Sequence, residues 1–335
     1  MTGGKIYEDI LNLKNYKANS KYNNNFFYNG RFAFYSILNE IKKRKINKIY
    51  LPNYICSSLI ESIPKSFQIF FYEINNKLEI VNIKCKDSVI LIIDFFGKRT
   101  VIDKSILKNN CIIYDKTFTF NYRYFNLKKN FFFSSPRKIF PSMICSIANI
   151  KNKNPKILNN KLLQLYKESI LGSNLRNSYN NSKYYSKSKI IEDFFIKKIY
   201  GLEDFFNKNF NNYKVENFFK NYFLSTSFDK KYLALKKNKQ LTNYYIRKIK
   251  NIKILDDKNI LFSLFLTKKK NKLVRYLRKN SIYISNYWTK PNLLKNKTLS
   301  HNLYEKLILL PNDFNLKESE IKKMSKIINN FFVRN

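Results

Sequence analysis

The chain has 335 residues, 44% of them hydrophobic and 17% aromatic, and a formal net charge of +41. This apolar content excludes a disordered protein, and the length is sufficient for a large domain together with a smaller one. The basic residues are spread along the whole chain and accompany an excess of Asn, Ile, Phe and Tyr over Gly, Pro and Trp, as A/T-rich codons would produce. The charge therefore indicates a solvated basic surface rather than a dedicated nucleic-acid site.

The cysteine and histidine content argues against two kinds of site. His301 is the only histidine, and no short paired spacing joins the four cysteines, Cys56, Cys85, Cys111 and Cys145. Neither a zinc site nor a histidine-based triad is therefore expected. The sequence also shows no signal peptide and no uninterrupted apolar run long enough to cross a bilayer. We expect a cytoplasmic protein with reduced thiols and no membrane span.

The first half of the chain alternates predicted strands and helices. Residues 1–25 are polar and contain a Gly-Gly pair, so we expect an N-terminal arm before a helix that runs from Arg31 to about Arg44. A second helix is predicted at 56–63, and strands are predicted at 48–51, 67–72, 89–95, 112–114 and 131–133. The mostly apolar runs are typical of parallel strands buried on both faces. This pattern predicts an α/β domain whose ligand sites lie at the carboxyl ends of its strands.

The second half of the chain predicts a smaller unit. The pattern from about 151 to 223 is helical and very polar, with a break at Gly201. A long helix over 228–250 links to a last unit with strands at 260–266 and 282–284 and helices at 272–279 and 318–332. We therefore predict a large domain at 26–227 with a mostly parallel sheet, and a small C-terminal α/β domain at 228–335.

Two side chains near predicted strand ends are candidates for a catalytic site. Asp115 ends an apolar run, and Lys138 follows 23 positions later in a short polar segment after the next predicted strand. A pyridoxal phosphate enzyme needs such a pair, because a lysine bonds to the cofactor and an acid holds a proton on its pyridine nitrogen, which makes the ring an electron sink. A glycine followed by a helix start, as at Gly30, also suits an anion such as the cofactor phosphate. The alternative for Gly30 is a glycine that merely starts the helix.

The order of elements resembles the DegT/DnrJ/StrS family, the sugar aminotransferases of pyridoxal phosphate fold type I. Residues 29–34, Asn-Gly-Arg-Phe-Ala-Phe, are similar to the family's Ser-Gly-Arg-x-Ala-Leu opening. This match implies that Gly30 and Arg31 bind the cofactor phosphate through the start of the helix. Residues 51–56 are similar to a family segment that lies over one face of the pyridine ring, which places Cys56 in a slot often filled by an aromatic residue.

Two further segments, which contain the candidate site residues, also resemble motifs of the family. Asp115 and Thr117 lie in a segment that resembles the family's Asp-x-Ala-Gln or Asp-x-Thr-His motif, which implies that Asp115 pairs with the pyridinium and Thr117 lies against the opposite ring face. Ser135 and Lys138 lie in a segment similar to the family's Ser-x-Arg-Lys motif, which implies that Ser135 binds the phosphate and Lys138 bonds to the cofactor. The family usually continues into an acid-Gly-Gly turn, whereas residues 142–145 read Ser-Met-Ile-Cys here.

Other matches are structural in character. Residues 94–97 resemble a family strand that ends in an aromatic residue and a glycine, a turn rather than a catalytic site. Trp288 and Pro311 match positions in the sequence of the family's small domain, and we expect them to pack there and not to catalyse.

The resemblance implies transfer of an amino group from an amino acid, typically glutamate, to a keto sugar on a nucleotide carrier, for surface polysaccharide or a related glycan. It also implies a homodimer, because active sites of the family use residues from both subunits. Two alternatives stay open. One is a protein of the same fold with altered or lost activity, such as a dehydratase or an inactive homologue. The other is a basic RNA-binding protein, against which the absence of a localised Arg-aromatic stripe counts.

Overall fold

The computed structural model describes residues 26–119, 130–135, 138, 146–151, 153, isolated positions between 164 and 220, 228–250, 252–255, 261–282, 284, 288–294, 298–313 and 316–334, apart from the side chains of 228–231. The predicted arm at 1–25, most of the polar helical region and the segment 142–145 lie outside the described residues.

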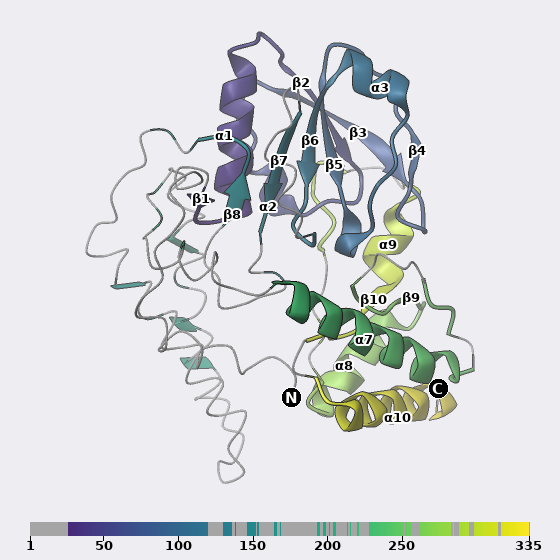
Figure 1. The fold of residues 1–335 in the computed structure, drawn as a ribbon. Helices are drawn as coiled ribbons and strands as arrows, with labels where there is room; N and C mark the ends of the chain where they lie inside the picture. The colour runs from purple at the N-terminus through teal and green to yellow at the C-terminus, as the bar shows by residue number, and fades with distance from the viewer. Residues whose placement is uncertain are drawn as a thin grey trace.

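The described part of the large unit is built around one sheet of eight strands, in the order β1-β8-β7-β6-β5-β2-β3-β4 (Figure 1). The strands are β1 (Phe26–Phe27), β2 (Lys48–Pro52), β3 (Gln68–Ile74), β4 (Ile80–Asn82), β5 (Val89–Ile93), β6 (Cys111–Asp115), β7 (Phe131–Ser134) and β8 (Ser146–Ala148). The central run β7-β6-β5-β2-β3 is parallel, whereas β4 and β8 pair antiparallel with their neighbours. The expected α/β fold with a mostly parallel sheet is confirmed.

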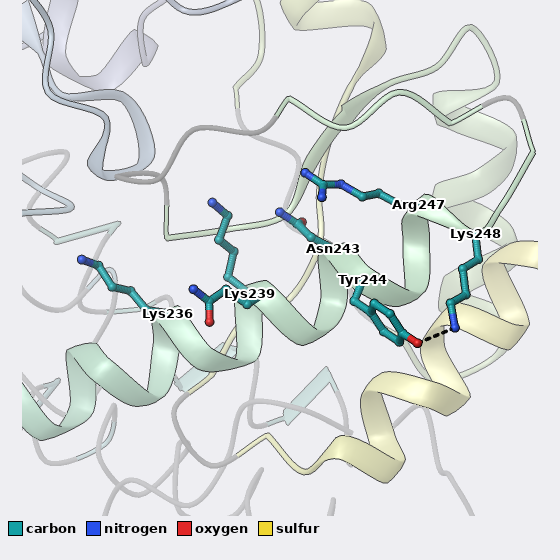
Figure 2. Close-up of a pocket in the computed structure, with 7 residues that line it drawn as sticks. Lys236, Lys239, Asn243, Tyr244, Arg247 and Lys248 are labelled. Carbon is teal, nitrogen blue, oxygen red and sulfur yellow. Dashed lines mark hydrogen bonds between the residues drawn. The ribbon is translucent and has the colours of Figure 1, made fainter.

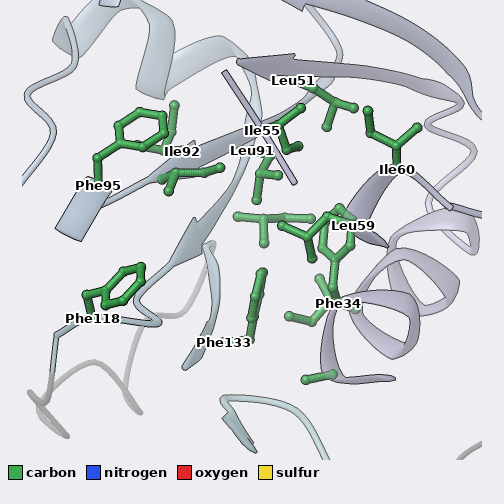
Figure 3. Close-up of a cluster of buried hydrophobic side chains, with 14 of the residues drawn as sticks. Phe34, Leu51, Ile55, Leu59, Ile60, Leu91, Ile92, Phe95, Phe118 and Phe133 are labelled. Carbon is green, nitrogen blue, oxygen red and sulfur yellow. The ribbon is translucent and has the colours of Figure 1, made fainter. Parts of the chain in front are cut away.

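Apolar side chains from several elements form the core of this unit. All five residues of β5 are buried, as a parallel strand covered on both faces requires. Helix α1 (Gly30–Lys42) buries an apolar stripe that includes Phe34, Ile37, Leu38 and Ile41. Phe34 lies against Phe133 of β7, with ring centroids 5.5 Å apart, and Figure 3 shows both among the buried side chains contributed by β2, β5 and the loops.

Shorter helices follow the strands. They are α2 (Ser57–Ile60), the 3-10 helix η3 (Phe95–Gly97) and α3 (Lys104–Asn109). The C-terminal unit contains α7 (Phe228–Arg247), β9 (Leu264–Leu266), α8 (Lys270–Lys279), α9 (His301–Lys306), β10 (Leu307–Leu309) and α10 (Glu318–Arg334). Strands β9 and β10 pair antiparallel, and a second buried cluster, which includes Ile246, Phe265, Leu277 and Ile328, joins α7, β9, α8 and α10.

Four sequence predictions about elements need correction, and one of them is the strand expected at 260–266, which is only Leu264–Leu266. The strand expected at 282–284 is wrong for its described residues, because Ile282 and Ile284 lie outside any strand. Ile282 donates its N–H to Leu277 O at 2.9 Å and Ser281 takes a left-handed φ of 61°, so these residues close the end of α8. The strand expected at 89–95 ends at Ile93, since η3 begins at Phe95, and the helix expected at 56–63 is only Ser57–Ile60.

The C-terminal unit is joined to the sheet by hydrogen bonds to the loop after β2. Tyr304 Oη accepts the N–H of Ile55 at 2.8 Å and lies 3.1 Å from Asn53 O and 3.0 Å from Ile55 O. Ser300 Oγ donates to Asn53 O at 3.1 Å. Trp288 packs on Tyr54 and stacks on Phe96, so aromatic contacts reinforce the same junction.

We expect Tyr304→Phe to lower the free energy of unfolding by about 1–3 kcal/mol, because the substitution leaves the buried N–H of Ile55 without its acceptor. Urea denaturation of both proteins measures this difference. Tyr245→Phe is the control, since the Tyr245 hydroxyl donates to the exposed carboxylate of Glu318 and its loss is expected to cost at most about 0.5 kcal/mol. Equal effects of the two substitutions would contradict the prediction.

Candidate active site

Three neighbouring parallel strands bring the predicted site residues to one edge of the sheet. In the ladder, Ile93 of β5 is paired with Asp115 of β6, and Asp115 with Phe133 of β7. These strands therefore end side by side, and the residues that follow them, including Ser135, lie at their common carboxyl edge. In open α/β sheets this edge is where ligands bind.

Asp115 lies buried at this edge, with only 5% of its surface exposed. Its Oδ1 accepts the N–H of Thr117 at 2.9 Å, and Thr117 itself is half-buried. Burial raises the pKa of the Asp115 carboxyl to about 6, and the charge of Asp94 adds to the rise, while hydrogen bonds from Thr117 and the charge of Lys138 oppose it. The fold therefore keeps a carboxyl in an environment that disfavours its charged form unless a cation is placed beside it.

Lys138 lies close enough to Asp115 for its positive charge to lower the pKa of the carboxyl. Its backbone N–H donates to Ser135 O at 3.1 Å, so one tight turn connects the two predicted site residues. The side chain of Lys138 is exposed, whereas Ser135 is buried. The structure thus brings Asp115, Thr117, Ser135 and Lys138 together, and their chemical roles stay predictions.

The start of α1 also lies at the carboxyl edge of the sheet, next to Ser135. A methyl group added at Gly30 would lie 3.4 Å from a ring carbon of Phe133 and 3.6 Å from Cβ of Ser135. Gly30 is the first residue of α1, and Asn29 caps the helix by accepting the N–H of Phe32 at 3.0 Å. The positive end of the helix dipole, which carries the half-buried Arg31 as its second residue, therefore lies next to Ser135, as binding of an anion would require.

Cys56 precedes α2 at the end of the loop after β2. It is half-buried, and its Sγ lies 3.0 Å from Ser58 Oγ. The described contacts do not connect Cys56 with Asp115, so its predicted position over a cofactor ring stays a prediction.

Asp94 and Lys116 were missed as parts of this site by the sequence interpretation, which treated 94–97 only as a turn. The two side chains form an ion pair in which Lys116 Nζ donates to Asp94 Oδ2, and both are buried, with 2% and 6% of the side chains exposed. Burial raises the pKa of Asp94, against the opposing charge of Lys116. The sequence did contain a signal for this ion pair. Asp94 directly follows one apolar strand and Lys116 directly follows the next, and two successive parallel strands are often neighbours in a sheet.

An aromatic layer contributed by the C-terminal unit lies over part of this edge. Phe118, three residues after Asp115, packs edge-on against Phe262 with centroids 5.7 Å apart and lies 5.5 Å from Phe96. The N–H of Leu261 donates to Phe96 O at 2.9 Å. The predicted catalytic edge is therefore partly screened from water by residues far away in the sequence.

The residues present fit pyridoxal phosphate by their chemistry. The start of α1 and the buried Ser135 suit a phosphate, Asp115 suits a protonated ring nitrogen, and Lys138 supplies an exposed amine at the same edge. Among the described residues, no group of three or more His, Cys, Asp and Glu side chains is arranged to hold a metal ion. Nor does the described part contain a helix that is both long and apolar enough to span a membrane.

A concave surface lies along α7 (Figure 2). This groove, with a volume of about 650 Å³, is lined by Lys236, Lys239, Gln240, Asn243, Tyr244, Arg247 and Lys248. Lys248 Nζ lies 2.9 Å from Tyr244 Oη, and none of the described lining residues is acidic. This groove is the described feature that best suits the RNA-binding alternative.

Comparison with solved structures confirms the fold. PseC of Helicobacter pylori, an aminotransferase involved in the biosynthesis of pseudoaminic acid, is 12% identical over 100% of this chain and 98% of its own, with a TM-score of 0.66. Spr1654 of Streptococcus pneumoniae, assigned as a sugar aminotransferase and solved in a PLP form, is 12% identical over 99% and 92%, with a TM-score of 0.61. A DegT DnrJ EryC1 StrS aminotransferase from Brucella abortus is 13% identical over 92% and 85%, with a TM-score of 0.53.

These similarities show that the chain has the architecture of pyridoxal phosphate fold type I, as it occurs in sugar aminotransferases. The resemblance predicted from the sequence is confirmed in the fold, at a sequence identity of 12–13%. No protein-family model and no curated protein matches the sequence.

Proposed function

We propose that this protein is a pyridoxal phosphate-dependent aminotransferase that transfers an amino group from an amino acid, glutamate in our expectation, to a keto sugar carried on a nucleotide. The observation that carries this proposal is the buried Asp115 at the same sheet edge as Lys138, Ser135 and the start of α1. The fold supports it, because the similar solved structures include sugar aminotransferases.

Each side chain has a specific task in this proposal. Pyridoxal phosphate, when bound, supplies an electron sink for the pair released from a Cα–H bond. Lys138 would bond to the cofactor until the donor amine displaces it, and its freed amine would then move the proton at Cα as a general base. Asp115 would hold a proton on the ring nitrogen, with Thr117 donating to the Asp115 carboxylate.

The remaining assignments concern binding. Ser135 and the backbone amides at Gly30 and Arg31 would hold the phosphate, and Thr117 and Cys56 would flank the ring. In the overall reaction the donor becomes a keto acid and the acceptor ketone becomes an amine. The exposed basic residues would attract the anionic nucleotide sugar, within the limits that salt screening sets.

We further propose that the protein acts in the cytoplasm as a homodimer in the synthesis of surface polysaccharide or a related glycan. Light scattering during size-exclusion chromatography measures the oligomeric state. The proposal includes no specific nucleic-acid partner.

Purified protein mixed with pyridoxal phosphate tests the cofactor, and the loaded protein mixed with glutamate and a panel of nucleotide-linked keto sugars tests the reaction. A visible absorbance band together with an aminated sugar, detected by mass spectrometry, supports the proposal. A band without amino transfer to any sugar would favour the alternative of altered or lost activity. Absence of a band, together with salt-sensitive RNA binding that charge removal in the α7 groove abolishes, would overturn the proposal.

A further inference from the structure

Lys116 connects three segments that carry the candidate site. Its backbone N–H donates to Phe133 O on β7 at 2.8 Å, and its carbonyl oxygen accepts the hydroxyl of Ser134 at 3.0 Å and the N–H of Thr119 at 2.9 Å. Its side chain forms the ion pair with Asp94 beyond the end of β5. Lys116 is also the residue directly after Asp115, and Ser134 directly precedes Ser135. Lys116 therefore contacts the segments that position both Asp115 and Ser135, the two predicted cofactor contacts.

Asp94 is held in turn by the strand edge. Its backbone N–H donates to Asp115 O at 3.0 Å, and its Oδ1 accepts the N–H of Thr100 at 3.1 Å. Thr100 Oγ1 donates to Ile93 O at 2.7 Å, which anchors the loop to the end of β5. The carboxylate thus presents Oδ2 to Lys116 from a rigid position.

Both charges of the pair are buried, so each charge is stabilised by the opposite charge of its partner. A buried charge whose partner is removed is strongly destabilising, whereas replacement of both charges by neutral groups is often tolerated. Lys116 is held by Asp94 and lies 5.0 Å from the ring centroid of Tyr114, so its ammonium is not presented as a nucleophile, in contrast to the exposed Lys138.

We propose that the Asp94–Lys116 ion pair is a positioning device that holds the carboxyl ends of β5, β6 and β7 together, so that Asp115 and Ser135 keep the separation needed to contact the two ends of one cofactor molecule. This inference rests on the proposed function. It assigns Asp94 and Lys116 to positioning rather than to catalysis.

The test compares Asp94→Asn, Lys116→Met and the double variant with the wild-type protein. One measurement is the urea midpoint of the protein without cofactor, and the other is the dissociation constant for pyridoxal phosphate from absorbance titration. Each single variant is expected to lower the urea midpoint and to weaken binding at least tenfold. The double variant is expected to recover most of the urea midpoint but to bind the cofactor at least tenfold more weakly, because no side-chain ion pair then joins the turn after β6 to the end of β5.

A carbon NMR titration of the cofactor-free protein provides a third measurement. The charged groups found to act on Asp115 are Asp94 and Lys138, with Thr117 as its hydrogen-bond donor, and those acting on Asp94 are Lys116 and Arg99. Removal of the like charge in Asp94→Asn is expected to lower the pKa of Asp115. An unchanged or higher Asp115 pKa would count against close coupling of the two groups.

The matched control is the less buried pair of Lys98 and Glu79, whose side chains are 15% and 48% exposed and whose Nζ and Oε1 atoms lie 3.2 Å apart. The variants Lys98→Met and Glu79→Gln, singly and together, are expected to leave cofactor affinity unchanged. Recovery of affinity along with the urea midpoint in the Asp94 and Lys116 double variant would show a purely structural pair and overturn the inference while the proposed function stands. Absence of cofactor binding by the wild-type protein would overturn both.

Discussion

Lys138→Ala is expected to remove the visible absorbance band that the wild-type protein forms with pyridoxal phosphate and to reduce amino transfer by at least roughly 10²–10⁴-fold, the usual contribution of one positioned acid–base group. The reason is geometric. Of the two lysines described near Asp115, Lys116 is bound in a buried ion pair, and only Lys138 has an exposed side chain. Absorbance titration and a coupled glutamate assay measure the two effects.

The control for this substitution is Lys104→Ala, at an exposed lysine that begins α3. Both lysines have exposed side chains, so both proteins are expected to unfold at similar urea concentrations. A band that persists in Lys138→Ala but disappears in Lys116→Met would reassign the covalent lysine and contradict the proposed roles.

Asp115→Asn is expected to make the cofactor-free protein more stable than the wild type at pH 7, by up to about 3 kcal/mol. Burial raises the pKa of Asp115 from its ordinary value of 3.8 to about 6, and each pKa unit corresponds to about 1.4 kcal/mol. The folded protein therefore holds this proton more tightly than the unfolded chain. The resulting stabilisation is complete below about pH 4 and is lost as the pH rises through about 6.

The difference in stability between Asp115→Asn and the wild type should thus be near zero at pH 4, grow between pH 4 and 6, and stay constant above pH 6. Urea denaturation at several pH values measures this difference. Asp103→Asn is a control of opposite sign, because hydrogen bonds from Ser105 lower the pKa of Asp103 and its contribution is lost as the pH falls. A difference for Asp115→Asn that does not change with pH would contradict the prediction.

The same substitution is expected to reduce amino transfer by roughly 10²–10³-fold, the usual effect of removing one preorganised electrostatic group. A neutral amide cannot stabilise a proton on the ring nitrogen as a carboxylate does. Addition of pyridoxal phosphate should then stabilise the wild type more than the variant. The cofactor-free protein would carry the cost of a buried carboxyl whose cationic partner is the bound cofactor.

Much of the fold could be predicted because its central strands are continuous apolar runs. The segments at β5 and β6 are recognisable as parallel strands covered on both faces, and α1 by its apolar stripe. Strands β1, β4 and β8 were not predicted, since two or three residues are too few to show a period. The strand predicted at 282–284 was wrong because the apolar Ile282 belongs to the closing turn of α8.

The sequence by itself determined the class of fold and the placement of Asp115 and Lys138 at or just beyond strand ends, because these follow from local apolar patterns and from the motifs. Only the tertiary structure decided which side chains meet across the chain. Strand register brings Asp94 to Lys116, helix packing brings Gly30 to Ser135, and the docked C-terminal unit brings Tyr304 to Ile55, 249 residues away. Such contacts depend on how whole elements pack, and no local pattern of residues encodes them separately.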